Sequence, residues 1–380
     1  MDFNYTEEQL MIQKAARDFA QSELLPGVIE RDETETFPAD QIKQMGELGF
    51  MGMMVDPKYG GSGLDTVSYV LAMEEISKVD ASASVVMSVN NSLVCWGIQT
   101  YGTEEQKEKY LPRLASGEII GAFCLSEPEA GSDATSQKTT AIDKGDHYLV
   151  NGTKNWITNG KTASVYIVIA QTDIDKKHKG INALIIERGT PGFEVGIKER
   201  KMGIRGSDTH SLMFTDVKVP KENRIGEDGF GFKFAMKVLS GGRIGIAAQA
   251  LGIASGAYEL ALKYSKERKS FGKEICNHQA IAFKLADMAL NIEAARHLCI
   301  KAAWDKDNGN NYDVSGAMAK LFASQTAMDT TIEAVQIHGG NGYVREYHVD
   351  RMMRDAKITQ IYEGTSEIQK IVISRSVING

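Results

Sequence analysis

The chain has 380 residues, 42% of them hydrophobic, which is enough for two or three packed units of ordinary globular composition. Its 43 basic and 50 acidic residues give a formal net charge of −7, so it lacks the basic surplus that binds duplex nucleic acid. The segment Met1–Gln9 is polar and acidic, unlike a signal peptide, and no run approaches the roughly 18 apolar residues of a membrane span. We therefore expect no membrane insertion and a cytoplasmic location, or the mitochondrial matrix after removal of a leader.

The cysteines and histidines do not form ligand patterns. Cys95, Cys124, Cys276 and Cys299 are widely separated and include no CxxC pair, which favours a reducing compartment and buried packing roles. The seven histidines include no HExxH or paired spacing, so no metal site is expected.

The first part of the chain is predicted to be helical. Thr6 and Gln9 form a capping box, and Ile12, Ala16 and Phe19 follow on one helix face. The glycine-rich stretch 60–63 marks a loop. These patterns predict an N-terminal helical domain over residues 1–120.

The texture then changes to short β-rich runs. Residues 148–150, 165–169, 183–186 and 212–214 are rich in β-branched and aromatic side chains and are separated by Gly, Asn and Asp turns. A middle β domain over residues 121–225 is the expectation.

The last part of the chain is free of proline, since all seven prolines lie at or before Pro220, and long helices require that absence. Steps of four and three residues connect the apolar members of a helix seam, namely Ile281, Leu285, Met288, Ile292, Ala295 and Cys299. Residues 226–380 are predicted to form a C-terminal bundle of four long antiparallel helices with a short tail. Helices, strands and helices in this order indicate an α+β fold.

Two segments of the β region have residues suited to a cofactor. Cys124–Asp133 combines small residues, hydroxyls and turn formers that can present backbone N–H groups to a flavin edge or a pyrophosphate. Trp156–Thr158 adds a flat aromatic beside a hydroxyl. Alone, the first segment also fits a surface turn and the second a core aromatic.

Three further segments settle the context. They are Glu267–Gly272, with the sequence ERKSFG, Gln336–Tyr343, with the sequence QIHGGNGY and followed by Arg351 and Asp355, and Ile361–Gln369, with the sequence IYEGTSEIQ. Together with Cys124–Asp133, they resemble the signatures of the acyl-CoA dehydrogenases in order and spacing, over essentially the whole chain.

The resemblance implies the same three-domain fold, a homotetramer, and FAD held between the β and C-terminal domains. The flavin contacts implied within one subunit are Phe123, Leu125, Ser126, Gly131, Ser132, Trp156, Ile157, Thr158, Thr365 and Glu367. Those implied from a neighbouring subunit are Arg268, Phe271, Gln279, Gln336, Gly339 and Gly340. Ser132, Arg243, Tyr362 and Gly364 match substrate-binding positions. The guanidinium of Arg268 is a donor fork suited to diphosphate, although on an exposed helix it would simply be solvated.

Glu363 matches the catalytic base of the family. The proton beside a thioester is weakly acidic, and a carboxylate enclosed against flavin and acyl chain has the raised proton affinity that its removal requires. In the family, the thioester carbonyl accepts hydrogen bonds from the backbone N–H of this glutamate and from a flavin hydroxyl, which stabilise enolate charge. Without the other motifs, Glu363 would be read as a solvated loop residue.

The implied reaction is the α,β-dehydrogenation of an acyl-CoA to the trans-2-enoyl-CoA, with electrons passed to an electron-transferring flavoprotein. Residues 242–253 resemble the short-chain, butyryl-type branch most closely. Ser240 departs from the Asp of many relatives, which leaves the contact made there open. Ala83–Val85 lacks the arginine of glutaryl-type relatives, and Glu363 argues against the isovaleryl branch.

Two alternatives remain open at this point. One is an acyl-CoA oxidase on the same fold, although oxidases usually carry a long C-terminal extension. The other is a non-enzymatic member of the fold that binds nucleic acid, against which the net acidity weighs.

Overall fold

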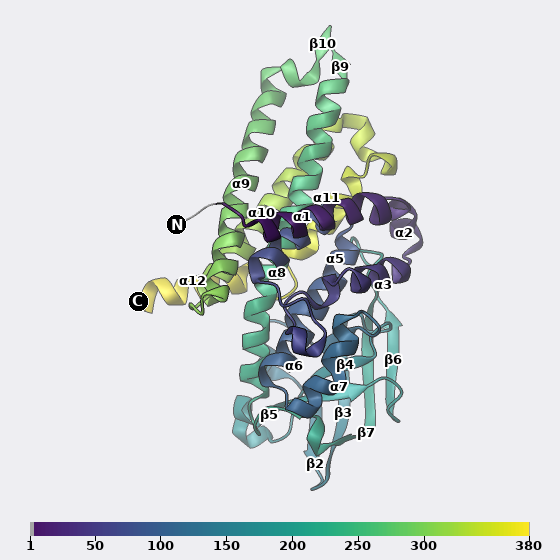
Figure 1. The fold of residues 1–380 in the computed structure, drawn as a ribbon, viewed down its shortest axis with the longest axis vertical. Helices are drawn as coiled ribbons and strands as arrows, with labels where there is room; N and C mark the ends of the chain where they lie inside the picture. The colour runs from purple at the N-terminus through teal and green to yellow at the C-terminus, as the bar shows by residue number, and fades with distance from the viewer. Residues whose placement is uncertain (1–3, 380) are drawn as a thin grey trace.

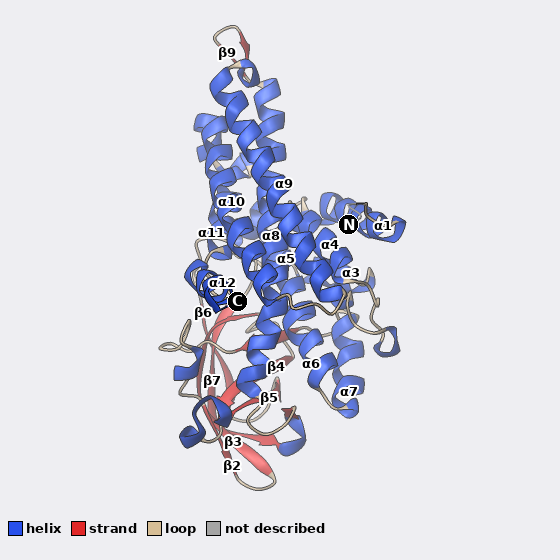
Figure 2. Ribbon diagram, turned by 90° about the vertical axis from the view of Figure 1, so that its left-hand side faces the viewer, coloured by secondary structure: helices blue, strands red, loops and turns tan. Residues whose placement is uncertain are grey.

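The computed structural model describes residues 4–379, and its order of helices, strands and helices confirms the α+β class (Figures 1 and 2). The β region lies at one end of the molecule, and the tips of the longest helices lie at the other (Figure 1). The exact domain boundaries at residues 120 and 225 stay predictions.

The N-terminal region is a set of packed helices. They are α1 (Glu7–Phe19), α2 (Val28–Thr34), α3 (Ala39–Glu47), α4 (Thr66–Ser77), α5 (Ala81–Ser88), α6 (Trp96–Tyr101) and α7 (Glu104–Ala115), with π-helical segments η1 (Ala20–Leu24) and η4 (Val89–Cys95). The predicted capping box is confirmed: Thr6 Oγ1 accepts from Gln9 N at 3.2 Å, and Gln9 Oε1 accepts from Thr6 N at 3.0 Å. Ala16 and Phe19 are buried on the predicted face.

The β region is a mixed sheet. Its strands are β1 (Gly121–Cys124), β2 (Thr140–Asp143), β3 (His147–Thr158), β4 (Val165–Gln171), β5 (Ile181–Glu187), β6 (Phe193–Lys198), β7 (Thr209–Pro220) and β8 (Arg224–Ile225). They pair in the order β6-β7-β3-β2-β4-β5-β8, with β1 parallel to β4. Strands β4 and β5 have continuous apolar sequences because both are buried on two faces.

Three long helices dominate the C-terminal region. They are α8 (Gly231–Glu267), α9 (Gln279–Asp307) and α10 (Asp313–His338), with the hairpin β9 (Lys269–Ser270) and β10 (Lys273–Glu274) between α8 and α9. The predicted α9 seam is confirmed from Leu285 to Cys299, which face the core. The prediction of four long helices is wrong for the fourth, because α11 (Val349–Thr359) has only 11 residues. Helix α10 ends before Gly339, which has a φ of 60°, and 3-10 segments lie between it and α11. Helix α12 (Ser366–Asn379) completes the chain.

Two helical stretches, residues 81–101 and 231–267, are long and apolar enough to cross a membrane by length and composition alone. This corrects the expectation that no stretch has such a composition. The most apolar window of residues 81–101 is 94% buried inside the fold, and that of residues 231–267 is 83% buried. Such burial is usual for core helices. Cys95, Cys124 and Cys299 are buried packing residues, as predicted, whereas Cys276 is half-buried.

Candidate active site

Glu363 lies in the loop between α11 and α12, and its backbone has a φ of 52°. Its carboxylate atom Oε2 is buried and has no hydrogen-bond partner. Burial raises the pKa of Glu363 to about 7, against the opposing charges of Lys320 and Arg243. A carboxylate that titrates near neutral pH and keeps a free oxygen is equipped to accept a proton.

Helix α8 passes directly beside this carboxylate. A Cβ atom built at Gly242 would lie 2.1 Å from Oε2 of Glu363 and 2.8 Å from Leu93 Cδ2. The next residue, Arg243, is buried, and its Nε has no partner. Burial lowers the pKa of Arg243, while Asp313 and Glu363 oppose that change. The structure therefore places a carboxylate with an unpartnered oxygen close to an incompletely satisfied cation.

Tyr362 links the loop to the helical core. Its hydroxyl donates to Gln249 Oε1, and Gln249 Nε2 donates to Ala81 O at 2.9 Å and Ser84 Oγ at 3.1 Å. Gln249 is fully buried. The side chain before the base is thus anchored to both α8 and α5.

The residue after the base is held by two donors. Lys320 Nζ donates to Gly364 O at 2.5 Å, and Gln369 Nε2 donates to the same oxygen at 2.8 Å. Both side chains belong to fully buried residues. Sequence reasoning did not identify Lys320, although a lysine on the Gly316, Lys320, Ala323, Ala327 face of α10 interrupts a stripe of small buried residues. That interruption is the signal for a functional lysine.

Predicted flavin contacts meet at the edge of the β region. Asn155 N donates to Ser126 O at 2.8 Å, which joins the segment Cys124–Asp133 to the residue directly before Trp156–Thr158. Trp156 has a φ of 61° and is 61% exposed, so a large aromatic face is left uncovered. Phe123, Leu125, Ser126 and Thr158 are half-buried, Gly131 and Ser132 are exposed, and the Ile157 side chain is buried in the β core.

A buried ion pair that the sequence did not reveal supports this edge. Lys154 Nζ lies 2.7 Å from Glu127 Oε1 and donates to Leu125 O at 2.9 Å. Burial favours the neutral form of Glu127, but the charge and hydrogen bond of Lys154 prevail and lower its pKa. The pair therefore fixes the turn that contains Ser126.

Segment η4 connects the β edge to the base. Gly121 N, at the start of β1, donates to Asn90 Oδ1 at 3.0 Å, and Leu93 of the same segment packs against Gly242. Thr365 and Glu367 lie beyond the base, where Thr365 Oγ1 accepts from Ile368 N at 3.4 Å and Glu367 is exposed.

The remaining predicted residues gather at the opposite end of the long helices. Arg268 and Phe271 lie at the hairpin between α8 and α9, far from the β region (Figure 1). Phe271 is 95% exposed with a φ of 50°. Gln279, Gln336, Gly339 and Gly340 are exposed too. The ring of Tyr264, just before Arg268, stacks on His338 at 4.3 Å, which brings the ends of α8 and α10 together. Within a single chain, these residues therefore do not lie near Glu363.

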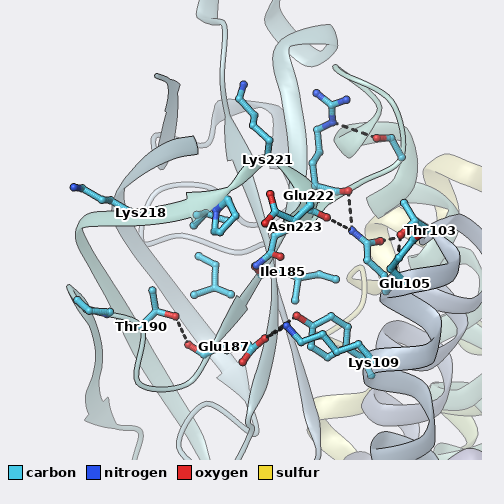
Figure 3. A pocket seen from close by; sticks show the side chains of 18 residues that line it. Thr103, Glu105, Lys109, Ile185, Glu187, Thr190, Lys218, Lys221, Glu222 and Asn223 are labelled. Atoms are coloured by element: carbon cyan, nitrogen blue, oxygen red, sulfur yellow. Dashed lines mark hydrogen bonds and ion pairs between the residues drawn. The ribbon is translucent and has the colours of Figure 1, made fainter. Parts of the chain in front are cut away.

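The described cavities lie elsewhere. One of about 780 Å³ lies between α7, β5 and β7, and Lys109 of its lining lies 2.6 Å from Glu187 (Figure 3). Another of about 760 Å³ lies beside α3. Neither is lined by a residue predicted from the sequence. Within residues 4–379, no group of three or more His, Cys, Asp or Glu side chains is arranged to hold a metal ion.

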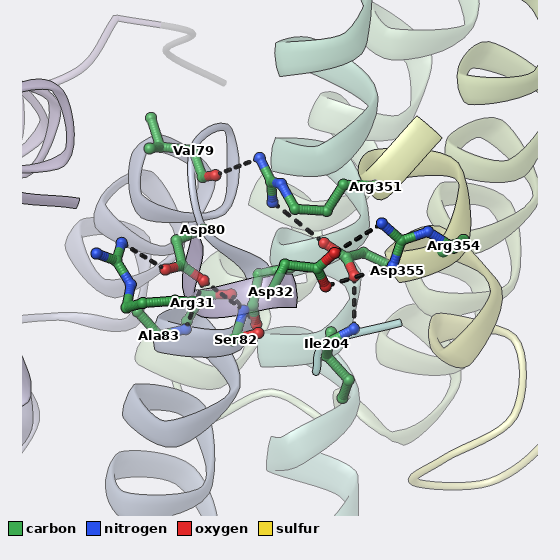
Figure 4. Close-up of polar contacts among 12 residues, drawn as sticks. Arg31, Asp32, Val79, Asp80, Ser82, Ala83, Ile204, Arg351, Arg354 and Asp355 are labelled. Carbon is green, nitrogen blue, oxygen red and sulfur yellow. Dashed lines mark hydrogen bonds and ion pairs between the residues drawn. The ribbon is translucent and has the colours of Figure 1, made fainter. Parts of the chain in front are cut away.

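A polar junction, formed by Asp32, Val79, Ile204, Arg351, Arg354 and Asp355, holds α11 against the rest of the molecule (Figure 4). Arg351 donates to Val79 O at 2.8 Å and to Asp355 Oδ2 at 3.2 Å, while Ile204 N donates to Asp355 Oδ1 at 2.5 Å. Burial raises the pKa of Asp355 to about 6.

Arg354 extends the junction to α2, because it lies 2.7 Å from Asp32. All three regions of the fold therefore meet at α11, which ends at Thr359, directly before the loop that carries Glu363.

Comparison with known families gives matches along the whole chain. The model for the acyl-CoA dehydrogenase N-terminal domain matches residues 6–118, that for the middle domain residues 122–217, and that for the C-terminal domain residues 229–378. The chain is 52% identical, over 377 residues, to the short-chain specific acyl-CoA dehydrogenase of Clostridium acetobutylicum, covering 99% of this chain and 100% of that one.

Solved structures are similar to this chain over its full length. Butyryl-CoA dehydrogenase from Megasphaera elsdenii has a TM-score of 0.98 and 52% identity, with full coverage of both chains. A structure described for the electron-transferring flavoprotein of Acidaminococcus fermentans has a TM-score of 0.99 and 53% identity, again with full coverage. PigA in complex with FAD has a TM-score of 0.96 and 30% identity, and both chains are fully covered.

Proposed function

This chain belongs to the acyl-CoA dehydrogenase family, and we propose that it converts a short-chain acyl-CoA, of the butyryl type, to the trans-2-enoyl-CoA. The observation that carries the proposal is the Glu363 carboxylate, which has a buried, unpartnered oxygen and a pKa of about 7. The similarity to butyryl-CoA dehydrogenase over the full chain supports the substrate class. An electron-transferring flavoprotein is the proposed acceptor, in line with the related structure described for such a protein.

The residues present fit FAD as the cofactor. Trp156 leaves most of its ring uncovered, and no other atom lies within 4 Å of a Cβ built at Gly131, so a flat ligand has an aromatic surface and room to approach the backbone. Ser126, Thr158 and the neighbouring Phe123 and Leu125 complete the proposed surface. When bound, FAD supplies the acceptor for the hydride that leaves the β-carbon of the substrate.

Glu363 carries out the proton transfer. The bond between the α-carbon and its hydrogen breaks, the proton moves to the carboxylate, and the electron pair forms the new double bond as the hydride leaves the β-carbon. Because Oε2 has no hydrogen bond to surrender, it can accept this proton without disrupting the loop. A pKa near neutrality makes the carboxylate a stronger base than an exposed glutamate while leaving about half of it ionised at pH 7.

The substrate is proposed to lie along α8 and the catalytic loop. Arg243, with its unpartnered Nε, and Ser132, Tyr362 and Gly364 are the proposed contacts. The hydroxyl of Ser240 donates to Met236 O at 3.1 Å, so its hydrogen bond is made within α8. Ser240 adds no charge at a position where many relatives carry an aspartate.

A second copy of the chain is proposed to complete the flavin site. Arg268, Phe271, Gln279, Gln336, Gly339 and Gly340 are exposed at the end of the molecule opposite the β region, so a neighbouring subunit has to present them. A bare, strained Phe271 also favours burial by a partner. We propose a homotetramer located in the cytoplasm or the mitochondrial matrix.

An anaerobic titration of the purified protein with acyl-CoAs of increasing length tests this function. We expect the flavin to bleach, with a higher kcat/KM for butyryl-CoA than for octanoyl-CoA. The opposite order would move the chain to a medium-chain substrate, and rapid peroxide formation in air would favour the oxidase. A protein that stays colourless after FAD addition would contradict the proposal as a whole.

A further inference from the structure

Lys320 is a buried cation whose position calls for an explanation. It lies in the N-terminal third of α10, has no exposed surface, and donates a hydrogen bond to the carbonyl oxygen of Gly364 at 2.5 Å. No carboxylate within salt-bridge distance neutralises it among residues 4–379. A buried ammonium without a paired anion is costly, so a packing role alone would favour an apolar residue here.

The carbonyl that Lys320 contacts belongs to an unusual backbone. Glu363 and Gly364 both have positive φ values, 52° and 93°, and Glu363 carries this conformation at an energetic cost because it has a side chain. Gln369 donates to the same carbonyl from α12 at 2.8 Å. One charged donor and one neutral donor therefore hold the peptide group immediately after the base.

Lys320 also acts on the base through its charge. The titratable and charged groups that face Glu363 are Tyr69 of α4, Arg243 of α8, Lys320 of α10 and Tyr362 of the loop. Glu367 of α12 is exposed and acts on Lys320. Burial raises the pKa of Glu363, and Lys320 is the strongest opposing influence, ahead of Arg243. Burial in turn lowers the pKa of Lys320 to about 8, and Glu363 opposes that change.

We propose that Lys320 is a positioning residue for proton abstraction, which anchors the loop at Gly364 and whose positive charge keeps Glu363 ionised and ready to accept the α-proton. This inference rests on the proposed function. It assigns to Lys320 of α10 an electrostatic role that the neutral side chain of Gln369 cannot fulfil. Gln369 shares the anchoring but carries no charge. The two side chains therefore separate loop anchoring from charge.

The test compares Lys320→Met with Gln369→Met in the FAD-loaded enzyme. Single-turnover flavin reduction by butyryl-CoA is followed as a function of pH, together with exchange of the methyl protons of acetyl-CoA into D₂O. Acetyl-CoA has α-protons but no β-carbon, so its exchange reports proton abstraction without hydride transfer. Both profiles of the parent are expected to rise as Glu363 loses its proton, with a midpoint near its pKa of about 7.

In Lys320→Met, the midpoint of the pH profile should move up by about one pH unit. At a pH below both midpoints, this shift lowers the rate about tenfold, whereas at high pH the rate stays closer to that of the parent. Gln369→Met should keep the parent midpoint even if its plateau falls. Lys320→Gln, which retains a donor but no charge, should move the midpoint as Lys320→Met does. Lys320→Arg, which keeps the charge, should stay near the parent.

Folding of Lys320→Met is checked by its FAD content and helical circular dichroism, and Gln369 is left to satisfy the Gly364 carbonyl. The inference would be overturned if Lys320→Met and Lys320→Gln both kept the midpoint of the parent pH profile. It would also be overturned if Gln369→Met moved the midpoint as far as Lys320→Met does. A parent enzyme that neither bleaches with butyryl-CoA nor exchanges acetyl-CoA protons would instead refute the proposed function, whatever the variants do.

Discussion

Gly242 and Glu363 are in contact across two elements that are distant in sequence: a Cβ atom at position 242 would lie 2.1 Å from the carboxylate atom Oε2. This separation is shorter than any stable non-bonded contact, so a side chain at position 242 and the present position of the base exclude each other. The absent side chain of Gly242 is therefore what allows α8 to pass closely beside Glu363, the proposed base.

Replacing Gly242 with Ala should displace the carboxylate. We expect flavin reduction by butyryl-CoA to slow by about 100-fold, since a misplacement of about 1 Å can cost that much. Gly241→Ala is the matched control, because a Cβ there would have only Lys306 Nζ nearby, at 3.9 Å, and alanine favours a helix interior by about 1 kcal/mol. Equal activity in the two variants would show that the base can move without loss.

Removing the carboxylate while keeping its shape should separate binding from chemistry. Glu363→Gln is expected to retain FAD and to bind butyryl-CoA, seen as a perturbed flavin spectrum, but to lose about 100- to 10,000-fold in the rate of flavin reduction. Glu367→Gln, four residues on and exposed, should keep substantial turnover. If Glu363→Gln stays within about tenfold of the parent, the base lies elsewhere.

The same substitution should change stability with a defined pH dependence. The pKa of Glu363 is raised from 4.5 to about 7 by burial, so the folded state holds a proton that the unfolded chain releases between these values. The stability of the parent therefore falls as pH rises through this window, and the full penalty is present above pH 7. Glu363→Gln should have a higher Tm than the parent at pH 8 and nearly the same Tm at pH 4.5. A constant difference across this range would contradict the raised pKa.

Local patterns were sufficient for part of this structure. The Thr6–Gln9 capping box and the α9 seam were predicted correctly because each depends on residues three or four apart, whose relation a helix fixes. The change to strands after residue 120 followed from composition in the same way. Glu363 was proposed as the base from the resemblance of its loop, and the structure adds the burial of its Oε2 atom and the absence of a hydrogen-bond partner for it. The cofactor and substrate roles of the other residues stay predictions.

Contacts between distant segments were beyond local patterns. Lys154 looks like an ordinary solvated lysine, and Lys320 interrupts a stripe of small residues without any indication of its partner. Only the packed structure shows that Glu127 and Gly364 are the partners of Lys154 and Lys320. The close approach of Gly242 to the base joins residues more than a hundred positions apart, and no spacing rule connects them. The apolar composition of residues 81–101 likewise has its explanation in the core that surrounds them.

The polar junction around α11 should make a large contribution to stability. Arg351→Met leaves Asp355, which is buried, with the Ile204 N–H as its remaining partner, and breaking a buried pair costs about 3 to 5 kcal/mol. Burial already raises the pKa of Asp355 to about 6, and loss of Arg351 raises it further. The decrease in Tm should thus be larger at pH 8, where the carboxylate is ionised, than at pH 5, where it is neutral.

Lys14→Met, which removes an exposed pair with Asp18, is the control for this comparison. Surface pairs contribute about 0 to 1 kcal/mol, so its Tm should change little at either pH. An Arg351→Met protein as stable as this control would show that the ion pair between Arg351 and Asp355 contributes little to stability.

Arg268→Ala should weaken FAD binding without unfolding the subunit, because Arg268 is exposed and its proposed partner is a phosphate of the cofactor. Loss of a charge-assisted hydrogen bond costs about 1.5 to 3 kcal/mol, which corresponds to roughly a 10- to 150-fold weaker affinity. Lys269→Ala is the control, since Lys269 already pairs with Glu274 at 3.4 Å. FAD retention after gel filtration, with circular dichroism as the check on folding, measures the effect.

The proposed assembly makes a stronger demand, because Arg268 and Glu363 of one chain would serve two different flavins. Glu363→Gln lacks the base but keeps Arg268, and Arg268→Ala keeps the base but retains FAD poorly. When the two variants are dissociated, mixed and reassembled at limiting FAD, some sites combine an intact base from one chain with an intact Arg268 from the other. Flavin reduction by butyryl-CoA should then exceed the sum of the separate variants. No gain on mixing, with hybrid formation demonstrated by differently tagged subunits, would place Arg268 outside the neighbour's flavin site.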